Sequence, residues 1–420
     1  MTIFLIVFVI AIAFSIVKTG NKILFNDIFW MFVFWGLIIG VYCFSGVKWT
    51  YSASVGLIAF LIVCFISFIT GRSYGAKKRV KLFYKETSIA NQQLFSFIGL
   101  LGVVLFSADY IRLNGLFSIK SGYEISIIGS IGNLMIPILL VLGLYMFANT
   151  LMSTGRVNIK ALLLLAAYTV PCILNSGRES VAFIIVGIAS LYGYYAKHNP
   201  VSHRYVNVKK MMRTLMIIMI VIGAMYFLVH ISKERFGDNE VSTFLNTHNV
   251  ATIAKDEAEQ WGDFEFLYYN IASYFSHQVS FLEFMFKEYK GPYMFGMYEL
   301  NIISRRLPSI LGLDYTQVSR QLRSLYGQLN VSYSGDWFTV LGSFMVDFGR
   351  IGCIVACFIC GYFTGKVKKK LRLYDDVRYA VLRAIICICM FSSIQLGPFY
   401  NTLIYGAFLW WLIIFRKDEA

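Results

Sequence analysis

The chain has 420 residues, of which 58% are hydrophobic and only 15% are charged, and its formal net charge is +15. A soluble domain usually has about 25% charged residues and less than half apolar ones, so the composition excludes an ordinary soluble protein. The positive charge does not indicate nucleic-acid binding, because no soluble basic domain is present to form a groove.

The apolar residues come in runs of roughly twenty, which is the length that a helix needs to cross a bilayer. We therefore predict an all-α integral membrane protein with about 11 transmembrane helices, within a range of about 10–12. A β-barrel would instead show short strands of alternating polarity. The predicted spans are Thr2–Val17, Ile23–Phe44, Tyr51–Thr70, Leu94–Ile111, Ile127–Met152, Lys160–Leu174, Val181–Ala196, Met211–His230, Val340–Thr364, Val381–Leu396 and Phe399–Phe415.

Basic residues follow the odd-numbered spans, whereas the even-numbered spans are mostly followed by none. The basic residues after the odd-numbered spans are Lys18, Lys22, Arg72, Lys77, Lys78, Arg79, Lys81, Lys85, Arg156, Lys160, Lys197, Arg204, Lys209, Lys210, Arg213, Lys366, Lys368, Lys369, Lys370, Arg372, Arg416 and Lys417. Cytoplasmic loops are enriched in Lys and Arg, so this pattern predicts an N-terminus outside and a C-terminus in the cytoplasm.

The pattern divides the chain into three parts. An N-terminal bundle of about eight helices is expected over 1–232, one large outer loop over 233–336, and a C-terminal bundle of about three helices over 337–420. The loop has nine Lys and Arg against thirteen Asp and Glu, a net charge of −4. The basic excess of the chain therefore lies in the short loops between spans, as the positive-inside rule expects.

The large outer loop is expected to contain amphipathic helices. Apolar residues recur near a 3.6-residue period from Phe264 to Phe286, while Glu265, His277 and Glu283 hold polar positions. Such a helix lies on the membrane surface or caps a cavity. A second helix is predicted from Thr316 to Tyr326.

No motif of a soluble enzyme is present, and no cofactor or metal is predicted. The eight cysteines all lie in predicted spans, so no disulfide framework is implied in the outer loop. Cys353, Cys357 and Cys360 share one face of a helix, where small apolar thiols are expected to serve packing. With five histidines in the chain and no cysteine in the outer loop, we do not expect a catalytic transition-metal site.

Arginines on the outer side are the most informative polar residues. The guanidinium fork suits phosphate and stays charged in a low dielectric, so arginines that converge at the membrane surface would hold a lipid-linked diphosphate. They could instead anchor lipid headgroups or pair with loop acids. Arg178 stands out, because it lies in a short turn near bilayer depth, where charge is costly. The set is Arg178, Arg235, Arg305, Arg306, Arg320 and Arg323.

Three further groups are candidates for chemistry. Glu179 could act as a base, pair with an arginine, or be an acid favoured by the helix dipole. His277 is a second candidate base. Tyr333 and Asp336, near the re-entry of the chain into the membrane, could contact sugars or mark the interface. Asp347 and Arg350 are three residues apart, and we expect an ion pair or a polar contact at a helix break near Gly349.

Three segments resemble the Wzy-type polymerases of bacterial surface polysaccharide, also called O-antigen polymerases. The turn Ser176–Glu179 is similar to a Gly/Ser-Arg turn at the start of a mid-chain span in that family. Gly291–Gly296 followed by Ile302–Pro308 resembles a loop segment before the family's proline. Thr339–Gly349, continuing through Gly361, resembles the helix after the large loop. The similarity in topology covers essentially the whole chain.

The resemblance implies a glycosyltransferase of GT-C type that works without a metal at the periplasmic face of the bacterial inner membrane. Such enzymes move a growing glycan from undecaprenyl diphosphate to the non-reducing end of one lipid-linked oligosaccharide repeat unit. Periplasmic arginines hold the diphosphate, and Arg178 is the first residue to which that role transfers, followed by Arg305 or Arg306 and then Arg320. The expected partners are this substrate, membrane lipids and a Wzz-type chain-length regulator, with no nucleic acid.

Two other functions remain open. An O-antigen ligase would share the topology and the large outer loop. A lipid-linked oligosaccharide flippase or other transporter should show paired halves and charged residues along several spans. In this chain the polar residues are instead concentrated in the one predicted outer loop.

Overall fold

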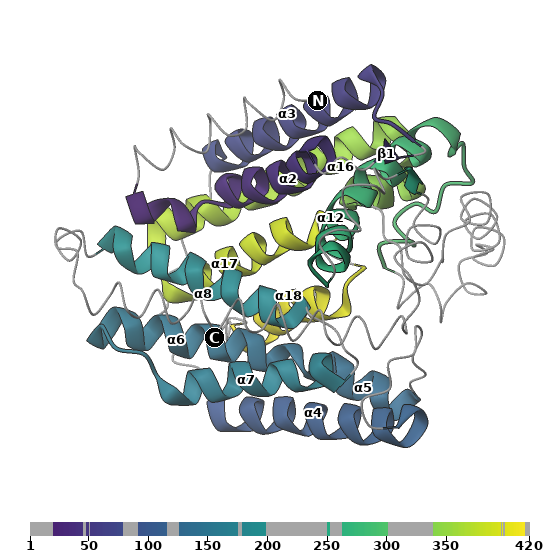
Figure 1. The fold of residues 1–420 in the computed structure, drawn as a ribbon. Helices are drawn as coiled ribbons and strands as arrows, with labels where there is room; N and C mark the ends of the chain where they lie inside the picture. Colours follow the sequence, from purple (N-terminus) through teal and green to yellow (C-terminus); the bar gives the residue numbers. More distant parts are fainter. Residues whose placement is uncertain are drawn as a thin grey trace.

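The computed structural model describes residues 20–44, 48–49, 51–78, 91–115, 126–174, 179–198, 250–252, 263–300, 339–395, 397 and 400–415 (Figure 1). This part of the chain is almost entirely helical, and six of its helices are long and apolar enough to cross a membrane. The chain is therefore an all-α, multi-pass membrane protein at this level of detail. The elements are η1 (Gly20–Phe25), α2 (Asp27–Phe44), β1 (Lys48–Trp49), α3 (Val55–Lys77), α4 (Gln92–Asn114), α5 (Ile127–Met135), α6 (Pro137–Thr154), α7 (Ile159–Leu174), α8 (Glu179–His198), β2 (Val250–Thr252), α12 (Asp263–Glu288), α16 (Val340–Tyr374), α17 (Val377–Ser392) and α18 (Thr402–Ile414).

Helices occupy every predicted span that falls within the described residues. The predicted spans Thr2–Val17 and Met211–His230 lie outside them. One predicted span, Ile127–Met152, is divided into α5 and α6 by Pro137, which stands at the first position of α6. Proline has no N–H to continue a helical ladder but is well suited to a first turn, so the division is expected from its position.

Several helices end together at one end of the bundle, which we call the basic end. The Lys369 ammonium donates hydrogen bonds to the carbonyls of Lys77 and Lys78, at 3.1 and 2.7 Å, so α3 and α16 end side by side. The Nε2 atom of His198, the last residue of α8, lies 2.7 Å from a carboxylate oxygen of Asp375. These contacts place three of the predicted basic loops on the same side.

The opposite end, which we call the loop end, holds the first turn of α3, the last turn of α12 and residues 289–300. The Glu283 carboxylate of α12 accepts hydrogen bonds from the backbone N–H and the hydroxyl of Ser54, each at 3.0 Å. There, β1 pairs with β2 in antiparallel orientation, with Lys48 opposite Thr252. These parts of the predicted outer loop therefore lie at the end of the bundle away from the lysines.

Glycines bring α3 and α16 into direct backbone contact. A Cβ atom added at Gly71 would lie 2.1 Å from the carbonyl oxygen of Phe358, and one at Gly361 would lie 2.0 Å from that of Phe68. Glycines four residues apart are known to allow such close approach of membrane helices. Because residue numbers rise together along both helices, the two run parallel, as Figure 1 shows for α3 and α16. The four contact glycines are Gly71, Gly75, Gly361 and Gly365.

The chain reverses its direction inside α16. Gly349 has φ 69° and ψ −176°, which interrupts the helix. The Cys353 sulfur lies 3.6 Å from the carbonyl oxygen of Leu341, whereas twelve residues of straight helix would separate them by about 18 Å. Residues 340–348 therefore lie beside the turns that follow Gly349. The break predicted near Gly349 is present, and it is sharper than a kink.

Asp347 and Arg350 have separate partners on either side of this break. The Asp347 carboxylate accepts hydrogen bonds from the backbone N–H groups of Tyr298 and Glu299, at 2.9 and 3.0 Å. The Arg350 guanidinium donates to the carbonyl of Phe286 and lies 4.3 Å from the centroid of its ring. The predicted ion pair is therefore wrong, and the alternative of polar contacts at a helix break is correct.

The second half of α12 is enclosed by the bundle. Residues 276–285 are buried without interruption, including His277 and Glu283. A helix lying on the membrane surface would leave one polar face exposed, so the described half of α12 does not take the first of the two predicted positions, on the membrane surface or over a cavity. Glu283 can be buried because Ser54 supplies two hydrogen bonds and the Lys287 ammonium lies 2.7 Å away.

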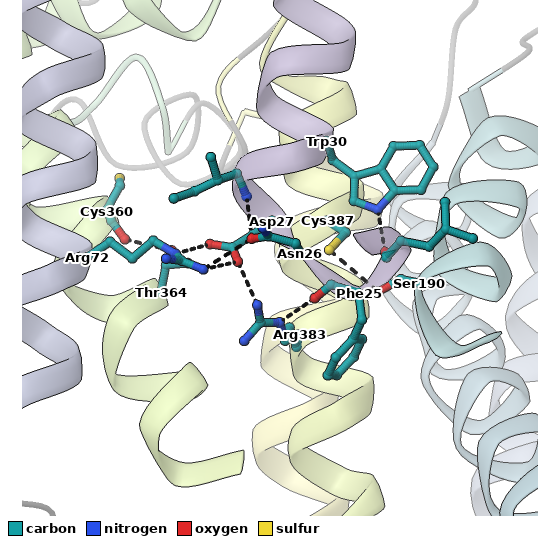
Figure 2. A network of polar contacts seen from close by, with 12 residues as sticks. Phe25, Asn26, Asp27, Trp30, Arg72, Ser190, Cys360, Thr364, Arg383 and Cys387 are labelled. Atoms are coloured by element: carbon teal, nitrogen blue, oxygen red, sulfur yellow. Dashed lines mark hydrogen bonds and ion pairs between the residues drawn. The ribbon is translucent and has the colours of Figure 1, made fainter. Parts of the chain in front are cut away.

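A buried ionic network joins α2, α3 and α17 toward the basic end (Figure 2). The fully buried Asp27 carboxylate accepts two hydrogen bonds from Arg72, at 2.6 and 2.7 Å, and one from Arg383 at 2.8 Å. Arg383 also donates to the carbonyl of Phe25 at 2.8 Å. One carboxylate thus holds two buried arginines, and the network carries one excess positive charge.

We predict that Asp27→Asn destabilises the protein more than Arg383→Met. The first change leaves two buried arginines without a counter-charge, which costs about 3–5 kcal/mol. The second change leaves a neutral pair of Asp27 and Arg72. Thermal unfolding of the purified protein in detergent would measure both variants. Equal unfolding temperatures for the two variants would contradict the charge count.

Candidate functional site

The structure describes two of the residues predicted to carry function, Glu179 and His277. The other predicted site residues lie outside the described residues. They are Arg178, Arg235, Arg305, Arg306, Arg320, Arg323, Tyr333 and Asp336. The candidate site is therefore built from the surroundings of Glu179 and from the polar groups that the fold brings toward it.

Glu179 is the first residue of α8 and is partly buried. The Asn401 amide donates a hydrogen bond of 2.7 Å to its Oε2 atom. The Asn401 Oδ1 atom accepts at 3.0 Å from the backbone N–H of Leu403, so Asn401 also caps α18. One amide therefore holds the starts of two helices together and orients a carboxylate between them. A carboxylate at this position is also favoured by the dipole of α8.

The segment just before Asn401 packs on the segment that follows α12. The rings of Tyr400 and Tyr298 are stacked, with centroids 5.1 Å apart and planes 28° apart. A Cβ atom at Gly397 would lie 1.5 Å from the Oε1 atom of Glu299. The buried Glu299 carboxylate thus occupies space that only glycine leaves free at position 397.

Asp347 fixes the same segment from the other side. It is fully buried, and its carboxylate accepts hydrogen bonds from the backbone N–H groups of Tyr298 and Glu299. The backbone N–H of Phe295 also donates to the Asp347 carbonyl at 2.9 Å. We call Glu179, Glu299, Asp347, Tyr298, Tyr400 and Asn401 the carboxylate assembly.

Ionisable side chains inside a membrane protein are costly and usually mark function. The carboxylate assembly joins residues from α8, α16, the start of α18 and the segment after α12, which are far apart in the sequence. Its members supply an acceptor for a proton, amide and hydroxyl groups for hydrogen bonds, and a stacked tyrosine pair. A carboxylate can act as a general base when it lies within hydrogen-bond reach of the proton that it accepts.

His277 lies in the enclosed half of α12. Its ring is nearly perpendicular to that of Phe281, with centroids 5.6 Å apart, and 5% of the residue is exposed. A helix on the membrane surface, one of the two predicted positions, would present His277 at that surface. The burial of the helix places it among packed side chains instead, so Glu179 is the better placed of the two candidate bases.

One group of three thiols could hold a metal ion among the residues that the structure describes. The sulfur atoms of Cys64, Cys353 and Cys357 all lie within 4.8 Å of one another at the contact of α3 and α16. Ionising three thiols in an apolar helix interface would be costly, so we interpret them as packing residues. Cys360, predicted to share their face, is not part of this group.

Sequence reasoning missed several polar residues of the loop end. Glu299 stands alone within an apolar segment, which is a signal that could have identified it. Arg112, near the end of α4, is largely exposed and pairs with Asp109 at 2.8 Å. The predicted alternation of basic loops would put the end of that span on the outer side, so Arg112 could have been included among the predicted outer arginines. Asn401 carried no such signal, because asparagine is common at helix starts.

Comparison with known proteins yields no relative. No family model matches the chain, and neither a curated protein nor a solved structure resembles it significantly. The functional argument therefore rests on the residues of this chain and on their arrangement.

We predict that Asn401→Asp destabilises the protein at pH 8 and much less at pH 5. The substitution keeps the shape of the side chain but places a second carboxylate 2.7 Å from Glu179. Two such groups can stay in contact only if one binds a proton, so lowering the pH restores the contact. Thermal unfolding of both proteins across this pH range is the measurement, and Asn401→Gln is the neutral control. A pH-independent difference from wild type would contradict the placement of Glu179.

Proposed function

We propose that the chain polymerises oligosaccharide repeat units linked to undecaprenyl diphosphate into O-antigen or a related surface polysaccharide. It would act as a GT-C-type glycosyltransferase, without a metal, at the periplasmic face of the bacterial inner membrane. The observation that carries this proposal is the Glu179 carboxylate, oriented by Asn401 at the start of a membrane helix. The preceding residue in the sequence is Arg178, the first candidate for holding a diphosphate.

The chemistry that we assign uses one base and cationic stabilisation of the leaving group. A hydroxyl at the non-reducing end of the acceptor unit attacks the anomeric carbon of the donor glycan and gives its proton to Glu179. The bond from the anomeric carbon to the diphosphate oxygen breaks, and its electron pair leaves with undecaprenyl diphosphate. Guanidinium groups such as that of Arg178 stabilise the developing negative charge.

The orientation of the bundle supports this location. Lysines and arginines gather at the basic end, and the positive-inside rule assigns that end to the cytoplasm. The carboxylate assembly includes residues that hold the loop segment 291–300 at the other end. The assembly would therefore open toward the periplasm, where lipid-linked repeat units are joined in this family.

Transport of a lipid-linked oligosaccharide is a second candidate function. Discontinuous helices at the substrate site are common in transporters, and α16 is interrupted at Gly349. The backbone N–H of Val340 donates to the carbonyl of Ser393 at 2.9 Å, so the start of α16 meets the end of α17 inside the bundle. A ligase would share the predicted topology, and only an experiment on the glycan separates the three functions.

We predict that deleting the gene leaves lipopolysaccharide core carrying one repeat unit, without the ladder of longer chains. Wild-type protein restores the ladder, whereas Arg178→Ala and Glu179→Gln do not, because the first loses the cation that stabilises the leaving diphosphate and the second loses the base. Glycan from each strain would be separated on a gel, with membrane levels of each variant measured beside it.

Gly56→Ala is the matched control, because a Cβ at Gly56 meets its nearest atom at an ordinary 3.4 Å. This variant should restore the ladder in full. A deletion strain whose core carries no repeat unit would point to a flippase or a ligase. A normal ladder with Glu179→Gln would remove that residue from the site.

A further inference from the structure

We propose that the surface around Arg350 at the loop end is a docking site for the isoprenoid diphosphate carrier, which reaches the enzyme sideways from the bilayer. This inference rests on the proposed function and deepens it, because it names the entry side of the donor. We call the surface formed by Arg350, Tyr293, Phe295, Phe348 and Ile351 the lateral patch.

The first argument is depth. From Arg350 to Lys369 the helix rises by nineteen residues, or about 28 Å at 1.5 Å per residue. This is close to the thickness of about 30 Å of a bilayer's hydrocarbon core. If Lys369 marks the cytoplasmic boundary, Arg350 lies at the level of the outer phosphates. Arg350 covers the ring of Phe286, which packs on Phe60 with ring centroids 5.3 Å apart. Phe60 lies in the second turn of α3, at the loop end, so this contact supports the same depth for Arg350.

The second argument is the state of the arginine. Arg350 is exposed, and among the described residues its guanidinium donates to one carbonyl, that of Phe286, and covers the ring of that residue. A guanidinium has five N–H donors in a fork that matches phosphate. Stacking on Phe286 fixes the plane of the fork, so further donors are held in place for an anion.

The third argument is the apolar surface beside it. Ile351 is 81% exposed and Phe295 is 73% exposed, and Phe348 and Tyr293 are exposed to a lesser degree. Phe295 has φ 50°, an unfavourable conformation for a residue other than glycine, and its ring remains outside the protein core. These side chains form a surface suited to an isoprenoid chain rather than to water.

The patch continues into the lipid-facing side of α16. Exposed apolar residues recur there at intervals of four, which is the pattern of one helix face against lipid. They are Ile351, Val355, Ile359 and Phe363. A carrier chain can therefore stay in the bilayer along this face while its diphosphate reaches Arg350.

The fourth argument joins the patch to the carboxylate assembly. In the segment 294–299, Phe295 is exposed, whereas Tyr298 and Glu299, three and four residues later, are buried. The Met294 and Phe295 N–H groups donate to the carbonyls of residues 346 and 347, so the segment is fixed on the break of α16. Asp347, three residues before Arg350, accepts a hydrogen bond from the Glu299 N–H, so the sugar of a diphosphate bound at Arg350 would have the carboxylate assembly beside it. An ordinary phospholipid has no such group to extend inward, so the position favours the glycan carrier.

The test is photo-crosslinking of the full-length protein in liposomes of phosphatidylethanolamine and phosphatidylglycerol that contain undecaprenyl diphosphate. A benzophenone amino acid replaces Phe295 in one sample. In the matched control it replaces Phe97 of α4, which is 64% exposed and lies on a helix that packs against α5, α6 and α7. Mass spectrometry identifies the lipid bound at each position.

We expect undecaprenyl diphosphate to be captured at position 295 well above its share of the lipids, and phospholipid to be captured at position 97. Adding Arg350→Ala should lower the capture at 295 about tenfold, because one charge-assisted interaction with phosphate is lost. Arg350→Lys should lower it less, since it keeps the charge but not the fork. Unchanged capture at position 97 shows that each variant is folded.

Capture in proportion to lipid abundance at position 295, or capture that Arg350→Ala leaves unchanged, would overturn the docking site. Because Phe295 is 73% exposed, Phe295→Ser in the strain assay gives an independent variant with little packing to lose, and a full ladder would also count against the site. The crosslink needs no catalysis. If the chain moves the carrier without joining glycans, the crosslink at position 295 is still expected. Only the glycan pattern predicted for the deletion strain would then be wrong.

Discussion

The reversal of the chain at Gly349 is the constraint on which the rest of the loop end depends. It places residues 340–348 beside the following turns of α16, and it leaves the backbone of residues 346 and 347 free to bind segment 294–299. Asp347 then fixes the N–H groups of Tyr298 and Glu299, which brings Glu299 against Gly397. The long part of α16 that follows the reversal begins at Arg350. The glycine contacts with α3 fix the part of α16 that follows Arg350. The lateral patch and the carboxylate assembly are therefore both attached to one rigid pair of helices, α3 and α16.

The buried Asp27 and the carboxylates of the carboxylate assembly are held in different ways. Toward the basic end, Asp27 is held by two arginines with short hydrogen bonds, an arrangement that specifies how α2, α3 and α17 meet. At the loop end, Asp347 is held by backbone N–H groups and Glu179 by an amide, without a direct ion pair in the part of the chain that the structure describes. A carboxylate held by neutral donors can still accept a proton, whereas one held by two guanidinium groups accepts one far less readily. This difference supports a structural role for Asp27 and a chemical role for Glu179.

The fold could be predicted from the sequence where long apolar runs were separated by charge, because hydrophobic length and the side of the lysines are local signals. The break at Gly349 could also be predicted, since a charged pair flanked a glycine in an apolar run. The partners of Asp347 could not, because they lie about fifty residues away and depend on how segment 294–299 docks. The same holds for His277, whose helix was correctly predicted but whose burial depends on the helices that pack against α12, such as α2 and α16. For the candidate site, Glu179 could be identified from its turn, whereas Asn401 and Glu299 could be identified as its neighbours only in three dimensions.

The central claim is that this chain joins lipid-linked repeat units, and reconstitution tests it most directly. Purified protein would be placed in liposomes with lipid-linked repeat units extracted from the deletion strain, in the presence of a metal chelator. The account predicts glycans of two or more repeats on one carrier, with one undecaprenyl diphosphate released for each new linkage. Repeat units that remain single, or that cross the membrane without being joined, would contradict it.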